Sequence, residues 1–426
     1  MTLSPSLQSA SKRITTALFV SQSFFAAAMI ASFTLTSIIA ADLSGNDKLA
    51  GLPSTMSLLG RAAIAYPLGW LMDRLGRRIT LAGGYFFGSL GAAISILAII
   101  WQSFPLFMFG SLIFGMGRAS SDQSRYIAAE VQTSNNRAKA IGFVVFAGTI
   151  GSVLGPRLVA PASELANNMG LDAYAGPSLI GMALTFVAGL VVLVFIYPDP
   201  LQIGRAWREQ EDEAALTAGT PTVIRATRPL LTIFRQPMVQ IAILSMIIGQ
   251  LVMTLLMTIT PLHMDHNSHS VDNIGWVLMA HTLGMFGFAS VTGWLIDRVG
   301  ALRVIALGGL ILVVSCILTP ISSGLWPLII ALFLLGLGWN FCFVAGSALL
   351  TASLSLEEKA RTQGATEALS ALASGVGSAS SGFFYAWGGM LVVAAFGLAL
   401  TLAILAQLAL QPRRQTTIAQ SGADIR

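Results

Sequence analysis

The sequence predicts an all-α membrane protein with twelve transmembrane helices in two pseudo-symmetric halves of six helices. Hydrophobic residues make up 55% of the 426 residues and charged residues only 10%, whereas a soluble domain carries about 25% charged residues. About twelve segments approach the roughly 20 apolar residues that a bilayer-crossing helix needs. A motif of the first half also returns in the second half. These features exclude an ordinary soluble enzyme.

The expected helices follow one another through short connections, except at one long polar segment. In chain order they cover residues 14–41, 50–72, 79–101, 105–131, 138–160, 176–197, 237–264, 274–297, 302–321, 326–353, 360–386 and 388–411. Residues 199–236 form this polar segment. Its mixed charge and three prolines predict a linker. The expected organisation is an N-terminal six-helix bundle (1–198), a cytoplasmic linker (199–236), a C-terminal six-helix bundle (237–411) and a cytoplasmic tail (412–426).

The positions of the basic residues predict the orientation. If the N-terminus is cytoplasmic, 19 of the 24 lysines and arginines fall on the cytoplasmic side, as the positive-inside rule requires. We therefore expect both termini in the cytoplasm. The first apolar run lacks a small-residue cleavage site, which indicates a spanning helix and not a signal peptide. The basic residues are scattered among loops, so we expect no nucleic-acid partner.

A repeated motif supports the two halves. GWLMDRLGRR (Gly69 to Arg78) recurs 224 residues later as GWLIDRVGAL (Gly293 to Leu302), each time at the end of the second helix of its half. The pair resembles the loop motif of the major facilitator superfamily, Gly-x-Leu-x-Asp-Arg-x-Gly-Arg-Arg, and the second copy lacks the basic pair. The resemblance covers the whole chain and implies the major facilitator fold of a secondary transporter. It assigns an inward gating role to Gly69, Asp73, Arg74, Gly76, Arg77, Gly293, Asp297 and Gly300.

Each type of residue in this motif has a physical role that we can predict. The glycines at 69 and 293 would allow close helix crossing, and those at 76 and 300 would permit a tight turn. The aspartates at 73 and 297 would lie against helix N-termini, where the helix dipole favours a negative charge.

Histidine and methionine are concentrated in one predicted hairpin of the second half. All four histidines lie within 19 residues, and seven of the 16 methionines lie between residues 238 and 285. At about 100° per residue, one helix face would carry a methionine stripe, made of Met246, Met253, Met257 and Met264. His281 and Met285 share a face of the next helix. In an antiparallel hairpin, Met253 would lie level with Met285, and Met257 with His281.

These side chains suggest a site for a soft metal ion. Thioether and imidazole groups together suit Cu(I) better than zinc, whose sites favour thiolate, imidazole and carboxylate. Neutral ligands can also release the ion without a protonation step. The candidate ligands are Met253, Met257, His281 and Met285. The alternative is that methionines at helical spacing only pack, although an ionisable histidine inside a span indicates function.

The two short patterns on these helices resemble a known pair. Met253-x-x-x-Met257 and His281-x-x-x-Met285 are similar to the motifs of the CcoA-like copper importers, a branch of the same superfamily. The resemblance implies copper import across the bacterial inner membrane for assembly of haem–copper cytochrome c oxidase, with these four residues as ligands. Copper would be the cargo and not a resident cofactor. The expected partners are the copper ion, the lipid bilayer and copper chaperones, and the protein would be a monomer.

Three further sets of residues are weaker candidates. The predicted periplasmic loop from Pro261 to His269 would either capture copper or be merely solvated, and its candidate ligands are His263, Met264, His266 and His269. Met29 corresponds to Met253 by the repeat offset, and it would face the same path or simply pack. A charged group on the inner helices would form either a structural salt-bridge cluster or a proton-coupling site. Its members are Arg61, Arg118, Asp122, Arg125 and Glu367.

Two other functions compete with copper import. The same fold would carry an organic solute such as riboflavin, stacked on Trp339, Phe341 or Phe343. A copper-binding membrane sensor or assembly factor that moves nothing is the third interpretation, and long soluble appendages would favour it, whereas the tails here are short. The sequence has no Walker loop and nothing that resembles a hydrolytic site, so we expect no enzymatic activity. Cys316 and Cys342 lie in apolar runs and suggest no disulfide framework.

Overall fold

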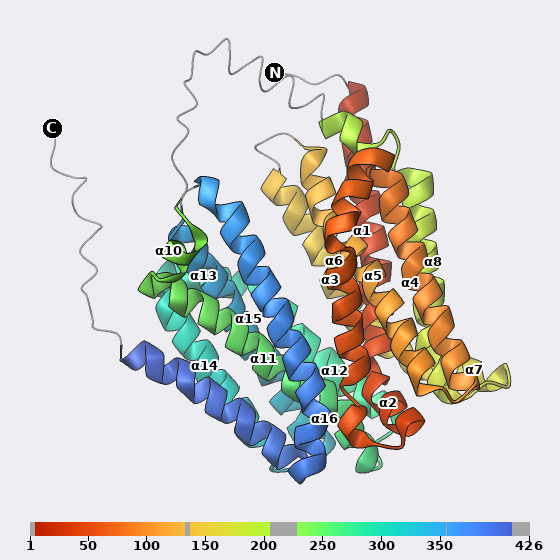
Figure 1. The fold of residues 1–426 in the computed structure, drawn as a ribbon, viewed down its shortest axis with the longest axis vertical. Coiled ribbons are helices and arrows are strands. Elements are labelled where there is room, and N and C mark those ends of the chain that lie inside the picture. The colour runs from red at the N-terminus through yellow and green to blue at the C-terminus, as the bar shows by residue number, and fades with distance from the viewer. Residues whose placement is uncertain (1–4, 133–136, 205–227, 355, 411–426) are drawn as a thin grey trace.

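A computed structural model describes residues 5–132, 137–204, 228–354 and 356–410. Within these ranges the protein is built from helices, which form two bundles (Figure 1). The first bundle contains α1 (Pro5–Thr34), α2 (Thr36–Ser44), η1 (Asp47–Leu49), α3 (Leu52–Leu75), α4 (Arg77–Ile100), α5 (Phe104–Glu130), α6 (Arg137–Arg157), α7 (Val159–Asn168), η3 (Ala173–Ala175) and α8 (Gly176–Phe195). The second contains α10 (Leu230–Phe234), α11 (Pro237–His266), α12 (Val271–Phe286), α13 (Ala289–Val299), α14 (Ala301–Leu318), α15 (Leu325–Ala352) and α16 (Leu356–Ala409).

The predicted all-α fold with twelve spans is confirmed. In the described part of the chain, eight helices are long and apolar enough to cross a membrane, and the bent pair of α12 and α13 adds a ninth. The helix α16 counts once in that number, but its backbone breaks at Gly388 and Gly389, which divides it into two spans. The helices α3 and α5 supply the remaining two, with 24 and 27 residues. They are less apolar because they carry ionisable side chains such as Arg61 and Asp122.

The polar segment between the bundles is only partly described. Residues 205–227 of the expected linker and the expected tail at 412–426 lie outside the described residues. The described end of the linker forms the short helix α10 before α11 begins at Pro237. There, the guanidinium of Arg228 pairs with the carboxylate of Glu358 at 2.7 Å. The two domain boundaries and the two cytoplasmic segments remain predictions.

The two ends of the molecule differ in how the halves meet. We call the end that carries Gly76 and Gly300 the inner end, because the basic residues predict that it faces the cytoplasm, and the opposite end the outer end. One apolar cluster, which we call the shared cluster, contains buried side chains of both halves. Its members at the outer end include Leu35, Ile38 and Ile39 of the first half and Val252, Leu255 and Leu262 of the second. The clusters at the inner end each belong to one half.

Polar and backbone contacts also join the halves at the outer end. The hydroxyl of Ser378 donates a hydrogen bond to the carbonyl oxygen of Gly51 at 2.8 Å. A Cβ at Gly51 would overlap the backbone carbonyl of Ser378, so only glycine permits this approach. Arg157 of the first half lies 4.0 Å from the ring centroid of Trp276 in the second half. The outer end is therefore closed.

The inner end is open. A cavity of about 650 Å³ separates the halves there, with α3 and α5 on one side and α11, α15 and α16 on the other. Figure 1 shows the same arrangement, with the bundles converging near α2, α12 and the middle of α16 and lying apart at the opposite end. We call this cavity the inner vestibule. The described conformation is therefore open to the inner side and closed to the outer side.

Candidate functional site

A second cavity lies deeper between the halves and is lined by methionine. Its volume is about 160 Å³, and we call it the methionine cavity. The first half contributes Met29 from α1, and the second contributes Met253 and Met257 from α11 and Met285 from α12. The structure thus brings together three of the four predicted ligands and the residue related to Met253 by the repeat.

Only the middle of the predicted methionine stripe faces this cavity. Met246 and Met264, at its two ends, are buried in the protein and do not line the methionine cavity. The sequence analysis proposed that Met264 helps to capture an ion from outside. In the structure Met264 is fully buried in the shared cluster, so its sulfur is not placed for this role. The stripe is present as a helix face, but neighbouring side chains cover Met264 at its outer end, and Met246 at its inner end lines the inner vestibule instead.

His281 lies apart from the methionine cavity. Its side chain is fully buried, and its Nδ1 atom lies 3.0 Å from the carbonyl oxygen of Leu332 on α15. The Nε2 atom is buried and has no hydrogen-bond partner among the described residues. His281 and Met285 both lie on α12, but only Met285 lines the methionine cavity. A buried imidazole nitrogen without a partner is unusual, and its lone pair is free to bind a metal.

A polar patch lies beside the methionines in the same cavity. Gln250 and Thr254 of α11 and Ser374 of α16 line it, and their side chains are mutually hydrogen-bonded at 3.1 to 3.3 Å. The indole of Trp339 donates to the amide oxygen of Gln250 at 2.9 Å, which fixes the orientation of that amide. Trp339 also stacks on Phe343, with ring centroids 4.9 Å apart. The sequence analysis did not identify Gln250, Thr254 or Ser374, because isolated polar residues in apolar helices form no motif.

The charged group on the inner helices is divided between the two cavities. Arg61 and Asp122 form an ion pair of 2.7 Å, and both line the inner vestibule with Arg125 and Glu367. Arg125 donates to the hydroxyl of Tyr126 at 3.1 Å. Arg118, on the same helix as Asp122, instead lines the methionine cavity. The predicted contact of Arg61 with this cluster is confirmed, and the predicted inclusion of Arg118 in the salt bridge is not.

Two of the predicted capture histidines are part of the closed outer end. The Nδ1 atoms of His263 and His266 lie 3.2 and 3.4 Å from the hydroxyl of Tyr385 on α16. His266 also lies 3.8 Å from Asp47 of the first half. His269 is separate, with its Nε2 atom 2.6 Å from the carbonyl oxygen of Ser323. The expected loop is shorter than predicted because α11 continues to His266, so the three imidazoles do not form one group.

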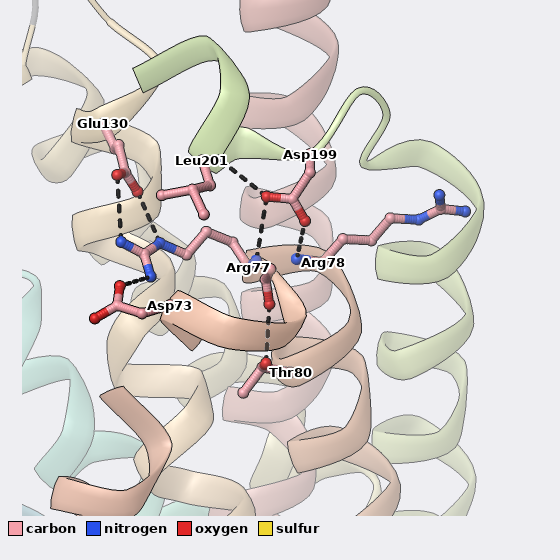
Figure 2. A network of polar contacts seen from close by, with 8 residues as sticks. Asp73, Arg77, Arg78, Thr80, Glu130, Asp199 and Leu201 are labelled. Carbon is pink, nitrogen blue, oxygen red and sulfur yellow. Dashed lines mark hydrogen bonds and ion pairs between the residues drawn. The ribbon is translucent and has the colours of Figure 1, made fainter. Parts of the chain in front are cut away.

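The loop motif of the first half forms the network in Figure 2. Arg77 pairs with Asp73 at 2.8 Å and with Glu130 of α5 at 3.0 Å. The carboxylate of Asp199 accepts hydrogen bonds from the backbone N–H groups of Arg77 and Arg78, at 3.2 and 3.0 Å. This carboxylate therefore caps α4 and offsets the partial positive charge of its first turn. The network links α3, α4, α5 and the segment after α8, all within the first half.

The expectations for the individual motif residues have mixed outcomes. The backbone φ angles of Gly76 and Gly300 are +86° and +87°, which confirms the predicted turns. The predicted close crossing at the glycines of 69 and 293 is wrong in this conformation, because a Cβ at either would meet nothing within 4 Å. Both lie near the inner end, where the halves are apart. Asp73 contacts Arg77 and not a helix N-terminus, a position that Asp199 occupies instead.

The remaining motif residues, Arg74 and Asp297, are exposed, and neither belongs to the network of Figure 2. The guanidinium of Arg74 lies 4.0 Å from the ring centroid of Trp70. Asp297 in the second copy is exposed near the end of α13. The second copy has Ala301 and Leu302 at the positions of the basic pair, so it cannot form the equivalent of the Arg77 network.

The chain resembles a known protein family in sequence and a solved transporter structure in fold. A family profile described as Major Facilitator Superfamily matches residues 17–266 and 241–424. The chain is 33% identical to the uncharacterised MFS-type transporter YddS of Bacillus subtilis, over 91% of this chain and 88% of that protein. It is 28% identical to the riboflavin transporter RfnT of Brucella anthropi, over 84% and 85%. The structure of the nucleoside transporter NupG is similar in fold, with a TM-score of 0.70, 15% identity and coverage of 94% and 100%.

Proposed function

The chain belongs to the major facilitator superfamily, and from this premise we propose that it imports copper through the methionine cavity. It is an MFS-type, multi-pass membrane protein. The observation that carries the proposal is the convergence of Met29, Met253, Met257 and Met285 on one cavity between the halves. A transported ion must bind where both halves reach it, because alternating access moves the halves around a fixed site.

The chemistry of these side chains favours Cu(I) as the cargo. Thioether sulfur is a soft, neutral ligand, so it binds a soft monovalent ion and releases it without proton transfer. Cys316 and Cys342 are buried and free and do not line the methionine cavity, so no thiolate competes there. His281 would complete the ligand set after a rotation of α12, through its unpartnered Nε2 atom. In the open conformation, the ion would leave through the inner vestibule past Asp122 and Glu367.

The cellular setting follows from the same proposal. Both termini would be cytoplasmic in a bacterial inner membrane, and cytoplasmic copper chaperones would receive the ion for cytochrome oxidase assembly. The protein would act as a monomer without a resident cofactor. The Arg61–Asp122 pair would hold α3 against α5 as a structural element, and proton coupling through Asp122 or Glu367 is the alternative role for these carboxylates.

Uptake of radioactive copper tests the proposal, and competition by other metal ions tests whether methionine sulfur binds the cargo. Cells with the gene should accumulate copper faster than cells without it. Silver should compete strongly, because Ag(I) shares the preference for thioether sulfur, whereas excess zinc or manganese should compete weakly. We expect at least about a tenfold difference in inhibitory concentration between silver and zinc, since soft and borderline ions differ strongly in affinity for thioethers. Equal competition by zinc would contradict a methionine site.

The outer histidines lead to a second expected result. Replacing His263, His266 and His269 together with glutamine should weaken uptake at low external copper and preserve it at high copper, because a capture site raises only the local concentration. Tyr385→Phe is the matched control, since it removes the hydroxyl that two of these imidazoles contact and leaves all three imidazoles in place. An equal loss of uptake at every copper concentration would place the histidines in the translocation path.

An organic solute such as riboflavin is the second candidate cargo. Two observations favour it: the similarity to RfnT over 84% of this chain, and the polar patch within the methionine cavity that Trp339 orients. This alternative predicts uptake of labelled riboflavin that falls in Trp339→Ala and is unchanged when the methionines become leucine. The copper proposal predicts the opposite dependence on these two sets of residues.

A further inference from the structure

The methionine cavity contains a cationic side chain that copper import alone does not explain. Arg118 of α5 lines the cavity with the methionines. Within the described parts of the chain, it forms no ion pair or hydrogen bond. The carboxylate one helical turn away, Asp122, is engaged by Arg61 at 2.7 Å. The cavity therefore presents a guanidinium group with free donors to whatever occupies it.

A guanidinium in this position is unfavourable for a bare metal cation. Charges of the same sign repel strongly where water is scarce. No carboxylate lines the methionine cavity, and the nearby carboxylate of Asp122 is already paired with Arg61. The volume of about 160 Å³ also exceeds the need of one ion, because a water molecule takes only about 30 Å³ of liquid. The site is better matched to an ion that arrives with a ligand of its own.

The free donors specify the chemistry of that ligand. The planar guanidinium group binds carboxylates in a bidentate geometry, with two parallel N–H···O bonds. The polar patch of Gln250, Thr254 and Ser374 lines the same cavity and can hydrogen-bond the remaining polar groups of a small ligand. The methionine sulfurs are then left for the metal. One cavity thus offers two kinds of contact, soft sulfur for copper and a cationic donor for an oxyanion.

We propose that Arg118 forms an oxyanion subsite and that copper enters the methionine cavity as a complex with a small carboxylate-bearing ligand. This inference rests on the proposed function, and it makes Arg118 a specificity-determining residue. The guanidinium binds the carboxylate, and the resulting charge neutralisation allows the cation to occupy the cavity.

Two thiols that differ only in the carboxylate provide a direct test. Cells or proteoliposomes would receive radioactive Cu(I) under anaerobic conditions, with excess cysteine in one arm and excess cysteamine, which lacks the carboxylate, in the other. The wild-type protein should take up copper at least about fivefold faster from cysteine, since bidentate charge-assisted hydrogen bonds are among the strongest polar contacts. Arg118→Gln should reduce this ratio to one, and Arg118→Lys should restore part of it. The control Arg125→Gln, on the same helix but in the inner vestibule, should leave the ratio unchanged.

The outcomes separate this inference from the proposed function. Equal uptake from both thiols by the wild-type protein, or faster uptake of copper in Arg118→Gln, would overturn the subsite and preserve copper import. Carbon-labelled cysteine that enters without copper, in an Arg118-dependent manner, would support the subsite and contradict copper as the cargo. Carbon label and copper entering together at equal amounts would support both. Copper uptake without any carbon label would overturn the joint transport that the inference requires.

Discussion

Replacing Met253, Met257 and Met285 together with leucine should abolish copper uptake and leave the protein folded in the membrane. All three side chains line the methionine cavity, and leucine keeps their apolar volume while it removes the sulfur. Such swaps usually cost less than about 1.5 kcal/mol each in stability. We expect uptake to fall by about a hundredfold or more, because three of the soft ligands are lost at once. Silver competition should disappear with it.

Two other methionines provide the matched control. Met264 and Met390 are buried, with exposed fractions of 0% and 4%, but they do not line the methionine cavity. A Met264→Leu, Met390→Leu double variant should therefore have a similar cost in stability and transport copper normally. Uptake and silver competition that survive in the triple variant would assign the cavity methionines to packing, and an organic cargo would then be the better interpretation.

Gly51→Val should stop transport of any cargo by holding the outer end open. A Cβ at this position overlaps the backbone carbonyl of Ser378, which cannot rotate away as a side chain could. The halves would then be unable to close at the outer end as they do here. To measure this, a cysteine at Thr258, which lines the methionine cavity, is labelled from outside with a membrane-impermeant maleimide. We expect labelling to rise by about tenfold, since closed packing excludes the reagent.

The chain supplies its own control and a low labelling background. Gly69→Val places the same side chain within α3, the helix that begins directly after Gly51, at a position where a Cβ meets nothing within 4 Å. It should have little effect on outer accessibility. Cys316 and Cys342 are both buried, so the reagent should react with neither. Normal transport by Gly51→Val would contradict the inference that outer closure depends on this contact.

The fold could be predicted from the sequence because membrane helices satisfy their own backbone hydrogen bonds. Apolar length alone therefore located spans such as 237–264, which the structure extends only to His266. The repeat at Gly69 and Gly293 then indicated two halves, and the turns at Gly76 and Gly300 required the left-handed backbone that glycine adopts. Each of these signals is local, so each could be recognised without knowledge of the neighbouring helices.

The candidate site could be predicted only in part, because it depends on contacts between helices that no local signal reveals. Helical spacing placed Met253 and Met257 on one face, but spacing does not say which neighbours that face meets. The same reasoning placed His281 with Met285, although the two side chains point to different surroundings across α12. The capping role of Asp199 was also hidden, because its partners on α4 are more than a hundred residues away in sequence.

The shared cluster at the outer end has a consequence for the temperature dependence of transport. Outward opening must bring water against side chains such as Leu35, Ile39 and Leu255, which are buried here between the halves. Hydration of apolar surface raises the heat capacity, so the enthalpy of the opening step changes with temperature. An Arrhenius plot of the uptake rate should therefore be curved wherever this step limits the cycle. The inner end, whose clusters each belong to one half, would contribute little to that curvature.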